Sequence, residues 1–346
     1  VAALTSNNIA ALTSLQLRAL SPTQVSSFTT DQLSSLSTTT LALLTAIQMG
    51  GLSAEKINNL GDPKVAVLSA TQVGGFSTTQ VSGLSTGALK ALNTSAIAVL
   101  SASQIKSLTT AQAESITTTT LGALKAIQIG FLETQDLAAL SSTALGALSG
   151  AQAAGLTTAQ LASLTSEKLA NLSTSAVAAL SIKQIPAMSS TQWADISSTT
   201  LRALTASQIG WMETRDVAVL TSNSIAALRS EQVQALSISQ IAGLTTQQVF
   251  DLNSTTLRTL TVKQIVSIET RDIAVLAAAR LDALSSTQIL ALTDGQIKAL
   301  TTTQVNGINS TTLRTLDLDQ IRVLETSDVA ALTSNNIAAL TSLQLR

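Results

Sequence analysis

An unbroken eight-residue repeat constrains the fold of this chain more than any other feature. Counted from Leu4 in steps of eight, every position up to Leu340 is Leu, Ile, Met or Phe. We call this set the first ladder. A second ladder, counted in the same way from Val1 to Leu345, is equally apolar. No insertion interrupts either ladder, and a register this strict is typical of a solenoid whose repeats occupy equivalent places in a stack.

The consensus of one repeat, or octad, is Ser/Thr, a small or polar pair, Gln, an aliphatic residue, two small residues and Leu. Residues Ser77 to Leu84 are a clean copy. Ser or Thr followed three residues later by Gln is a capping box, which marks a helix start. The two apolar residues lie three positions apart, so they share a helix face and cannot share a strand face. A β-solenoid remains the alternative, because stacked strands also align Gln side chains.

One continuous helix would not fit this period. Eight residues make about 2.2 helical turns, so an apolar stripe would rotate by about 80° per octad and find no common core. We therefore predict an all-α solenoid in which each octad forms a helix of about two turns, followed by an immediate bend. Small residues before the first ladder, such as Gly74 and Gly75, should let neighbouring backbones approach closely. Trp193 is predicted to be core, Trp211 partly exposed, and Pro186 to distort its helix.

The sequence also has a longer period. Residues 1–18 recur letter for letter at 329–346, a spacing of 328 residues or 41 octads. We expect residues 1–346 to form one continuous octapeptide-repeat solenoid that is a window of a longer array. Within it, Thr-rich landmarks begin at residues 38, 118, 198, 254 and 310, so that successive modules are 80, 80, 56 and 56 residues long.

Each landmark except the first is followed by a charged octad. These octads begin Glu-Thr-Gln-Asp at 133, Glu-Thr-Arg-Asp at 213 and 269, and Glu-Thr-Ser-Asp at 325; the first module has Ser-Ala-Glu-Lys at 53 instead. One interpretation is duplication history, in which modules were copied with their peculiarities. The functional hypothesis is that the charged octads set register within the stack or form lateral docking points, since an Arg precedes three of the Glu residues by eleven positions. The residues concerned are Glu133, Asp136, Arg202, Glu213, Asp216, Arg258, Glu269, Asp272, Arg314, Glu325 and Asp328.

Catalytic and cofactor chemistry is not expected. The chain has no His and no Cys, so the commonest general base and the thiol nucleophile are missing. One Glu and one Asp three residues apart make a poor calcium or zinc site, and we predict no metal and no cofactor. A net charge of −1 with scattered basic residues argues against nucleic acid as a partner. Ser, Thr and Gln recur too often for a membrane span.

Runs such as LTTAQLASL at 156–164 and LSASQIKSL at 100–108 resemble the low-complexity tandem arrays of very large secreted or surface-anchored, adhesin-like bacterial proteins. The resemblance implies an extracellular or cell-surface structural role. We therefore expect a fibre, filament or stalk whose partner is the chain itself, by head-to-tail continuation and by lateral association of strands. The alternative is a Ser/Thr lattice at the second and third octad positions that binds ice, glycan or a mineral surface. A protein-recognition solenoid would need a more varied, charged or aromatic face than this one.

Overall fold

Short helices follow one another throughout the described part of the chain. The computed structural model describes residues 3–345, and these form 41 α-helices of four to six residues and one 3₁₀ helix, with no β-strand. The all-α prediction is thereby confirmed. No helix among these residues is long and apolar enough to cross a membrane. Val1, the first member of the second ladder, lies outside the described residues.

The octad of Ser77 shows why each helix begins where it does. The backbone N–H of Gln80 donates to Ser77 Oγ (3.1 Å), and the Ser77 N–H donates to Gln80 Oε1 (2.8 Å), which completes the predicted capping box. Helix α10 (Thr78–Gly83) follows, and Leu84 returns to extended backbone with φ −62° and ψ 137°. The extended residue ends the helix after fewer than the two turns that we expected. Both ladder residues, Val81 and Leu84, are buried.

Contacts within the chain divide it into two compact units, residues 1–180 and residues 181–346. The helices of unit 1 are α1 (Ser6–Ala10), α2 (Ser14–Ala19), α3 (Pro22–Ser26), α4 (Thr30–Ser35), α5 (Thr38–Leu41), α6 (Ala46–Gly50), α7 (Ala54–Asn58), α8 (Asp62–Val65), α9 (Ala70–Gly74), α10 (Thr78–Gly83), α11 (Thr86–Ala91), α12 (Thr94–Ile97), α13 (Ala102–Lys106), α14 (Thr110–Glu114), α15 (Thr118–Ala123), α16 (Ala126–Ile129), α17 (Thr134–Ala139), α18 (Ser142–Gly146), α19 (Gly150–Ala154), α20 (Thr158–Ser163), α21 (Ser166–Ala170) and α22 (Thr174–Ala178).

The helices of unit 2 are η1 (Ile185–Ala187), α23 (Ser190–Ala194), α24 (Ser198–Ala203), α25 (Ala206–Gly210), α26 (Thr214–Ala218), α27 (Ser222–Ala226), α28 (Ser230–Ala235), α29 (Ile238–Ala242), α30 (Thr246–Asp251), α31 (Ser254–Thr259), α32 (Val262–Val266), α33 (Thr270–Ile273), α34 (Ala278–Leu281), α35 (Ser286–Leu290), α36 (Asp294–Lys298), α37 (Thr302–Gly307), α38 (Ser310–Thr315), α39 (Leu318–Arg322), α40 (Thr326–Ala330) and α41 (Ser334–Ala339). That the whole chain is one continuous solenoid stays a prediction.

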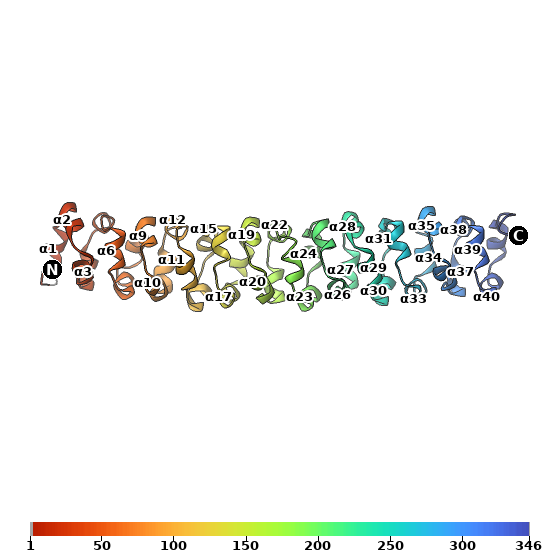
Figure 1. Ribbon diagram of the computed structural model, residues 1–346, viewed down its shortest axis with the longest axis horizontal. Helices are drawn as coiled ribbons and strands as arrows, with labels where there is room; N and C mark the ends of the chain where they lie inside the picture. Colours follow the sequence, from red (N-terminus) through yellow and green to blue (C-terminus); the bar gives the residue numbers. More distant parts are fainter. Residues whose placement is uncertain (1–2, 346) are drawn as a thin grey trace. The chain divides into compact units, whose positions relative to one another are not determined.

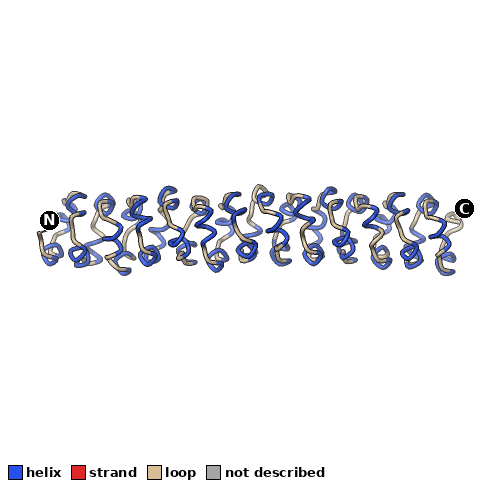
Figure 2. Tube along the Cα trace, turned by 90° about the horizontal axis from the view of Figure 1, so that it is seen from below, coloured by secondary structure: helices blue, strands red, loops and turns tan. Residues whose placement is uncertain are grey.

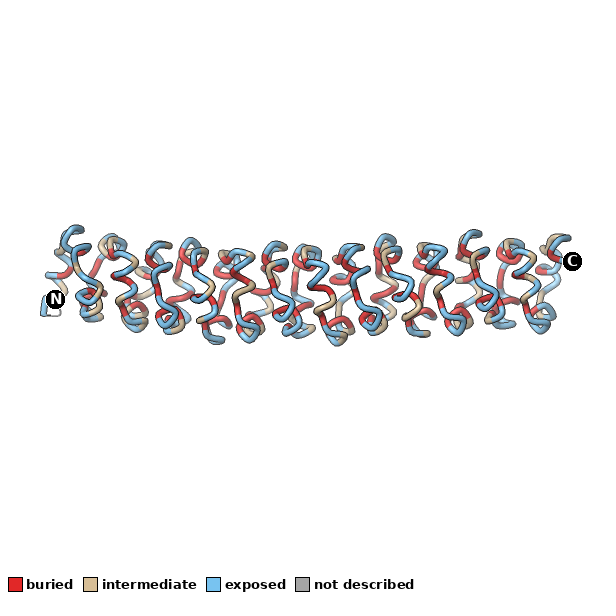
Figure 3. Tube along the Cα trace, viewed as in Figure 1, coloured by how far each residue is buried: buried red, intermediate tan, exposed pale blue. Residues whose placement is uncertain are grey.

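Within each unit the octads wind as a superhelix. A helix contacts the third helix after it, as α3 contacts α6 and α14 contacts α17 in unit 1, and as α25 contacts α28 and α38 contacts α41 in unit 2. Figures 1 and 2 show the short helices of each unit alternating with tight turns along one direction. Most ladder residues are buried and make up the hydrophobic core of each unit, and Figure 3 colours the backbone by this burial.

The Gln side chain joins one superhelical turn to the turn before it. The Nε2 of Gln80 donates to the carbonyl oxygens of Met49 (2.8 Å) and Leu52 (2.7 Å), which lie 31 and 28 residues earlier. Gln240 in unit 2 donates in the same way to Ile209 (3.0 Å) and Met212 (2.7 Å). Each of these two Gln side chains therefore satisfies both a helix start and the C-terminal carbonyls of a helix on the preceding turn.

Small residues permit this close stacking, as the sequence predicted. A Cβ atom added to Gly75 would lie 2.7 Å from the Cβ of Ala46 on the preceding turn. A larger residue at either position would separate the turns and lengthen the Gln bonds. Trp193 is fully buried and Trp211 is half exposed, which confirms both predictions. Around Pro186 the α-helix is replaced by the 3₁₀ helix η1, which confirms the predicted distortion.

Candidate functional site: the charged marker octads

The four charged octads, which we call the marker octads, comprise residues 133–140, 213–220, 269–276 and 325–332 and contain helices α17, α26, α33 and α40. In each of them Glu replaces the capping Ser or Thr, and its side chain makes no capping hydrogen bond. Asp replaces Gln three residues later. The marker octads therefore depart from the consensus at both residues of the capping box.

The four marker aspartates are buried between turns. Asp136, Asp216, Asp272 and Asp328 are each at most 2% exposed. The Oδ1 atom of each accepts a hydrogen bond from a hydroxyl 26 residues earlier, for example from Thr110 to Asp136 (2.9 Å) and from Ser190 to Asp216 (2.9 Å). The bonds from Thr246 to Asp272 and from Thr302 to Asp328 are equivalent. These aspartates are therefore buried against their own chain.

At this octad position most long side chains are hydrogen-bond donors. Besides the Gln residues, Lys56 Nζ donates to the Ser26 carbonyl (2.6 Å) and Lys168 Nζ to the Leu140 carbonyl (3.0 Å) on the preceding turn. An ionised Asp has no proton to give to such carbonyls. The Oδ2 atoms of Asp136 and Asp216 are buried and make no hydrogen bond to the described residues. The marker octads thus lack the donor that ties other turns together.

Burial perturbs two of these carboxyls. It is the largest influence on Asp136 and raises the pKa of that carboxyl above the ordinary value of 3.8; the nearby Glu133 charge acts in the same direction, and the Thr110 hydrogen bond opposes it. Burial also raises the pKa of Asp216, against the opposing effects of the Ser190 hydrogen bond and the Arg215 charge. Both sites therefore favour the neutral acid more than an exposed Asp does.

Replacing Asp216 by Asn is expected to raise the melting temperature at pH 7. Because the pKa of Asp216 is raised by folding, the native state holds the proton of this carboxyl more tightly than the unfolded chain does. The free energy of unfolding of the wild type therefore falls as pH rises through the raised pKa. The neutral Asn lacks this loss, and its amide restores a donor. The melting-temperature gain should shrink towards pH 4, as measured by circular dichroism. Asp294→Asn, an exposed change on α36, is the control. An equal gain at pH 4 and pH 7 would contradict the proton linkage.

The Glu and Arg residues of the marker octads lie on the surface. Arg215 Nε is 2.8 Å from Glu213 Oε2 and 3.7 Å from Asp216 Oδ1. Arg271 repeats the arrangement with Glu269 (2.9 Å) and Asp272 (3.6 Å). The Arg of this Glu-x-Arg sequence, and not the Arg eleven residues earlier, is the ionic partner of the Glu. Exposed pairs of this kind contribute little stability.

The arginines that precede the marker glutamates by eleven residues do not form the predicted pairs with them in the same way. Arg202 Nη1 donates to the Ala227 carbonyl (2.7 Å) on the following turn. In unit 2, helices α31 and α38, which carry Arg258 and Arg314, lie along the upper edge in Figure 1, whereas α26, α33 and α40 lie along the lower edge. The structure thus separates Arg258 and Arg314 from the marker glutamates.

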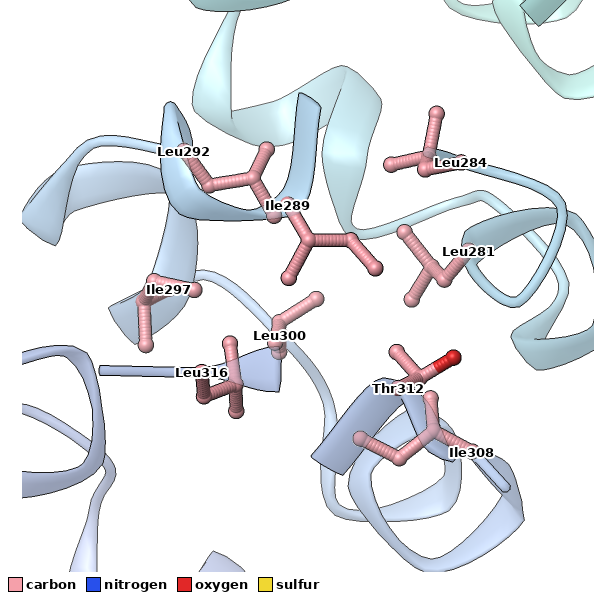
Figure 4. A pocket seen from close by; sticks show the side chains of 9 residues that line it. All are labelled: Leu281, Leu284, Ile289, Leu292, Ile297, Leu300, Ile308, Thr312 and Leu316. Carbon is pink, nitrogen blue, oxygen red and sulfur yellow. The ribbon is translucent and has the colours of Figure 1, made fainter. Parts of the chain in front are cut away.

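A small cavity lies beside one Thr landmark. Thr312 stands where most octads have Gln, and the apolar side chains around it leave a cavity of about 20 Å³ (Figure 4). Its lining is otherwise aliphatic: Leu281, Leu284, Ile289, Leu292, Ile297, Leu300, Ile308 and Leu316. Such a volume accommodates about one water molecule and no larger ligand. The residues described also contain no cluster of three or more acidic, His or Cys side chains for a metal ion.

The surface does not carry a regular hydroxyl lattice. The cap hydroxyl of a consensus octad, such as Ser77 Oγ, accepts its bond within the helix start. The third octad position is exposed but holds Leu15, Ile47 and Lys183 as well as Ser and Thr. A flat lattice for ice or mineral would need one residue type repeated at one spacing. The exposed positions therefore favour a structural role over surface binding.

Sequence reasoning found the capping box but missed the second role of Gln. The available signal was that Lys56, Lys64 and Lys168 replace Gln, because Lys shares with Gln a long side chain that donates hydrogen bonds. Asp at the Gln position is the exception to this pattern, because an ionised Asp cannot donate a hydrogen bond.

Comparison with known proteins finds similarity to one repeat family. The family model described as the ALTTAQ repeat matches the chain four times, at residues 1–38, 129–166, 209–246 and 265–302. The matches cover less than half of the 346 residues and lie in both units. No curated protein matches the chain. The chain is therefore a tandem-repeat array with segments similar to the ALTTAQ repeat.

Proposed function

We propose that this protein is a structural repeat protein that forms an extracellular fibre, filament or stalk by stacking octads. The observation that carries the proposal is the pair of Gln Nε2 bonds between successive turns, as Gln240 makes to Ile209 and Met212. Each turn presents carbonyls at equivalent octad positions to the Gln side chains of the next turn. Further octads therefore lengthen the array without a new kind of contact. Length and stiffness are what such an array supplies.

Composition and surface chemistry support the same role. Cys is absent, so stability does not depend on the redox state of the compartment. The exposed third octad position holds residues as varied as Leu15 and Lys183, which leaves no regular hydroxyl lattice for a surface ligand. A location outside the cell or on its surface is expected from the resemblance to secreted arrays, and this location is part of the proposal.

Negative-stain electron micrographs of the native material are expected to show filaments of constant width. Antibodies against the chain should label intact, unpermeabilised cells, because the fibre is proposed to lie outside them. Compact particles without filaments would refute the fibre, and labelling that requires permeabilisation would refute the location. An antibody against a cytoplasmic protein is the control for cell integrity.

A further inference from the structure

The marker octads of unit 2 recur after whole superhelical turns. Contacts between adjacent turns join residues 25 to 31 positions apart: Gly210 lies beside Ala235, and Gln240 Nε2 bonds to Met212 and Ile209. One turn therefore takes about 28 residues. The marker octads begin at 213, 269 and 325, which are 56 residues, or two such turns, apart. Helices α26, α33 and α40 accordingly lie along the same edge of unit 2 in Figure 1.

This edge carries both signs of charge. The side chains of Glu213 and Arg215 are 45% and 67% exposed, and those of Glu269 and Arg271 are 47% and 65% exposed. Glu325 is exposed as well, and Arg322 precedes it by three residues. The marker octads of Glu213 and Glu269 thus each present an acid paired with a base, whereas Arg322, on α39, pairs with Asp319 and not with Glu325.

An apolar side chain adjoins the first marker octad. Trp211, two residues before Glu213, is 53% exposed, although the only other Trp is fully buried. Trp and Arg are the residue types of this edge that are enriched in protein-binding surfaces. We call the surface formed by Trp211 and the three marker octads of unit 2 the marker face.

We propose that the marker face binds the marker face of a second copy of the chain, with the two copies antiparallel. A two-fold axis at α33 would place Glu269 opposite Arg271 of the second copy and Arg271 opposite its Glu269. The octad of Glu213 would then meet the octad of Glu325, with Arg215 opposite Glu325. A parallel arrangement in register would instead oppose like charges. The two-fold contact is self-complementary, as isologous interfaces are.

The spacing of the marker octads determines which kind of partner can match them. Marker groups two turns apart can be matched along their length only by a surface with the same spacing, and a second copy has it. Each exposed ion pair is weak, so the strength comes from several pairs engaged together and from burial of Trp211. This lateral contact goes beyond the proposed fibre, which requires only stacking along one chain.

Charge reversal tests the contact. The chain is compared by sedimentation velocity with Arg215→Glu/Arg271→Glu and with Glu213→Arg/Glu269→Arg. Wild type is expected to form dimers that dissociate at high salt. Each variant alone should associate at least tenfold more weakly, and a 1:1 mixture of the two should recover association. Arg258→Glu/Arg314→Glu, the same charge change on helices of the opposite edge, is the matched control and should associate as wild type does.

Trp211 provides a second measurement. Its emission should shift to shorter wavelength on association, and Trp211→Phe, which leaves only buried Trp193, should abolish that shift. A monomeric wild type, a mixture of the two charge variants that fails to associate, or a control that loses association equally would each overturn the proposal. None of these outcomes bears on whether single chains build filaments, which the micrographs decide separately.

Discussion

Replacing Gln240 by Leu is expected to lower the stability of unit 2 by about 2–5 kcal/mol, because two buried carbonyls and one backbone N–H each lose a hydrogen bond. Gln240 Oε1 accepts from the Ser237 N–H (2.7 Å), and its Nε2 donates to two carbonyls of the preceding turn. Leu would fill the space but bond to none of them. Hydrogen exchange should accelerate at residues 209–212 and 237–241, and the melting temperature should fall.

Two further variants isolate the cause. Gln234→Leu makes the same chemical change at an exposed position of α28, and it should leave the melting temperature nearly unchanged. Gln240→Lys keeps a donor of the kind that Lys168 provides at the equivalent position, so it should lose less stability than Gln240→Leu. Equal losses for Gln240→Leu and Gln234→Leu would show that the bonds between turns do not stabilise the fold.

Replacing Leu148 by Asp is expected to cost about 4 kcal/mol or more, because it places an unpaired charge in the core of unit 1. Leu148 is 2% exposed and belongs to the first ladder. Since every octad packs against neighbours on adjacent turns, the damage should extend to those turns and appear as a loss of the 222 nm circular dichroism band at lower temperature.

Thr158→Asp introduces the same residue at an exposed site. Thr158 is the first residue of α20, where a negative charge suits the helix dipole, so this variant should melt close to wild type. A comparable fall in melting temperature for both variants would show that the first ladder is not the core.

The marker octads illustrate why the sequence identified unusual residues without locating them. Glu213 and Asp216 stand out equally from the consensus, and the sequence makes both candidates for setting register or for lateral docking. The structure buries Asp216 against Ser190 and leaves Glu213 on the surface beside Arg215. Their different positions depend on which residues of the preceding turn lie next to them, and no spacing within one octad contains that information.

The sequence by itself determined the octad. The capping box of Ser77 and Gln80, the helix face shared by Val81 and Leu84, and the small residues between turns all follow from interactions within a few residues or from side-chain size. Such local preferences are fixed by backbone geometry and need no knowledge of the rest of the chain.

Only the tertiary structure decided how octads meet. The number of octads per turn depends on the angle at each extended residue such as Leu84, and this angle is set by packing against residues about 28 positions away. That angle fixes the carbonyls that Gln80 reaches, the burial of the marker aspartates, and the edge on which α26, α33 and α40 recur. A local pattern cannot specify these features, because a small change in the angle at each bend accumulates over a turn and brings different residues into contact.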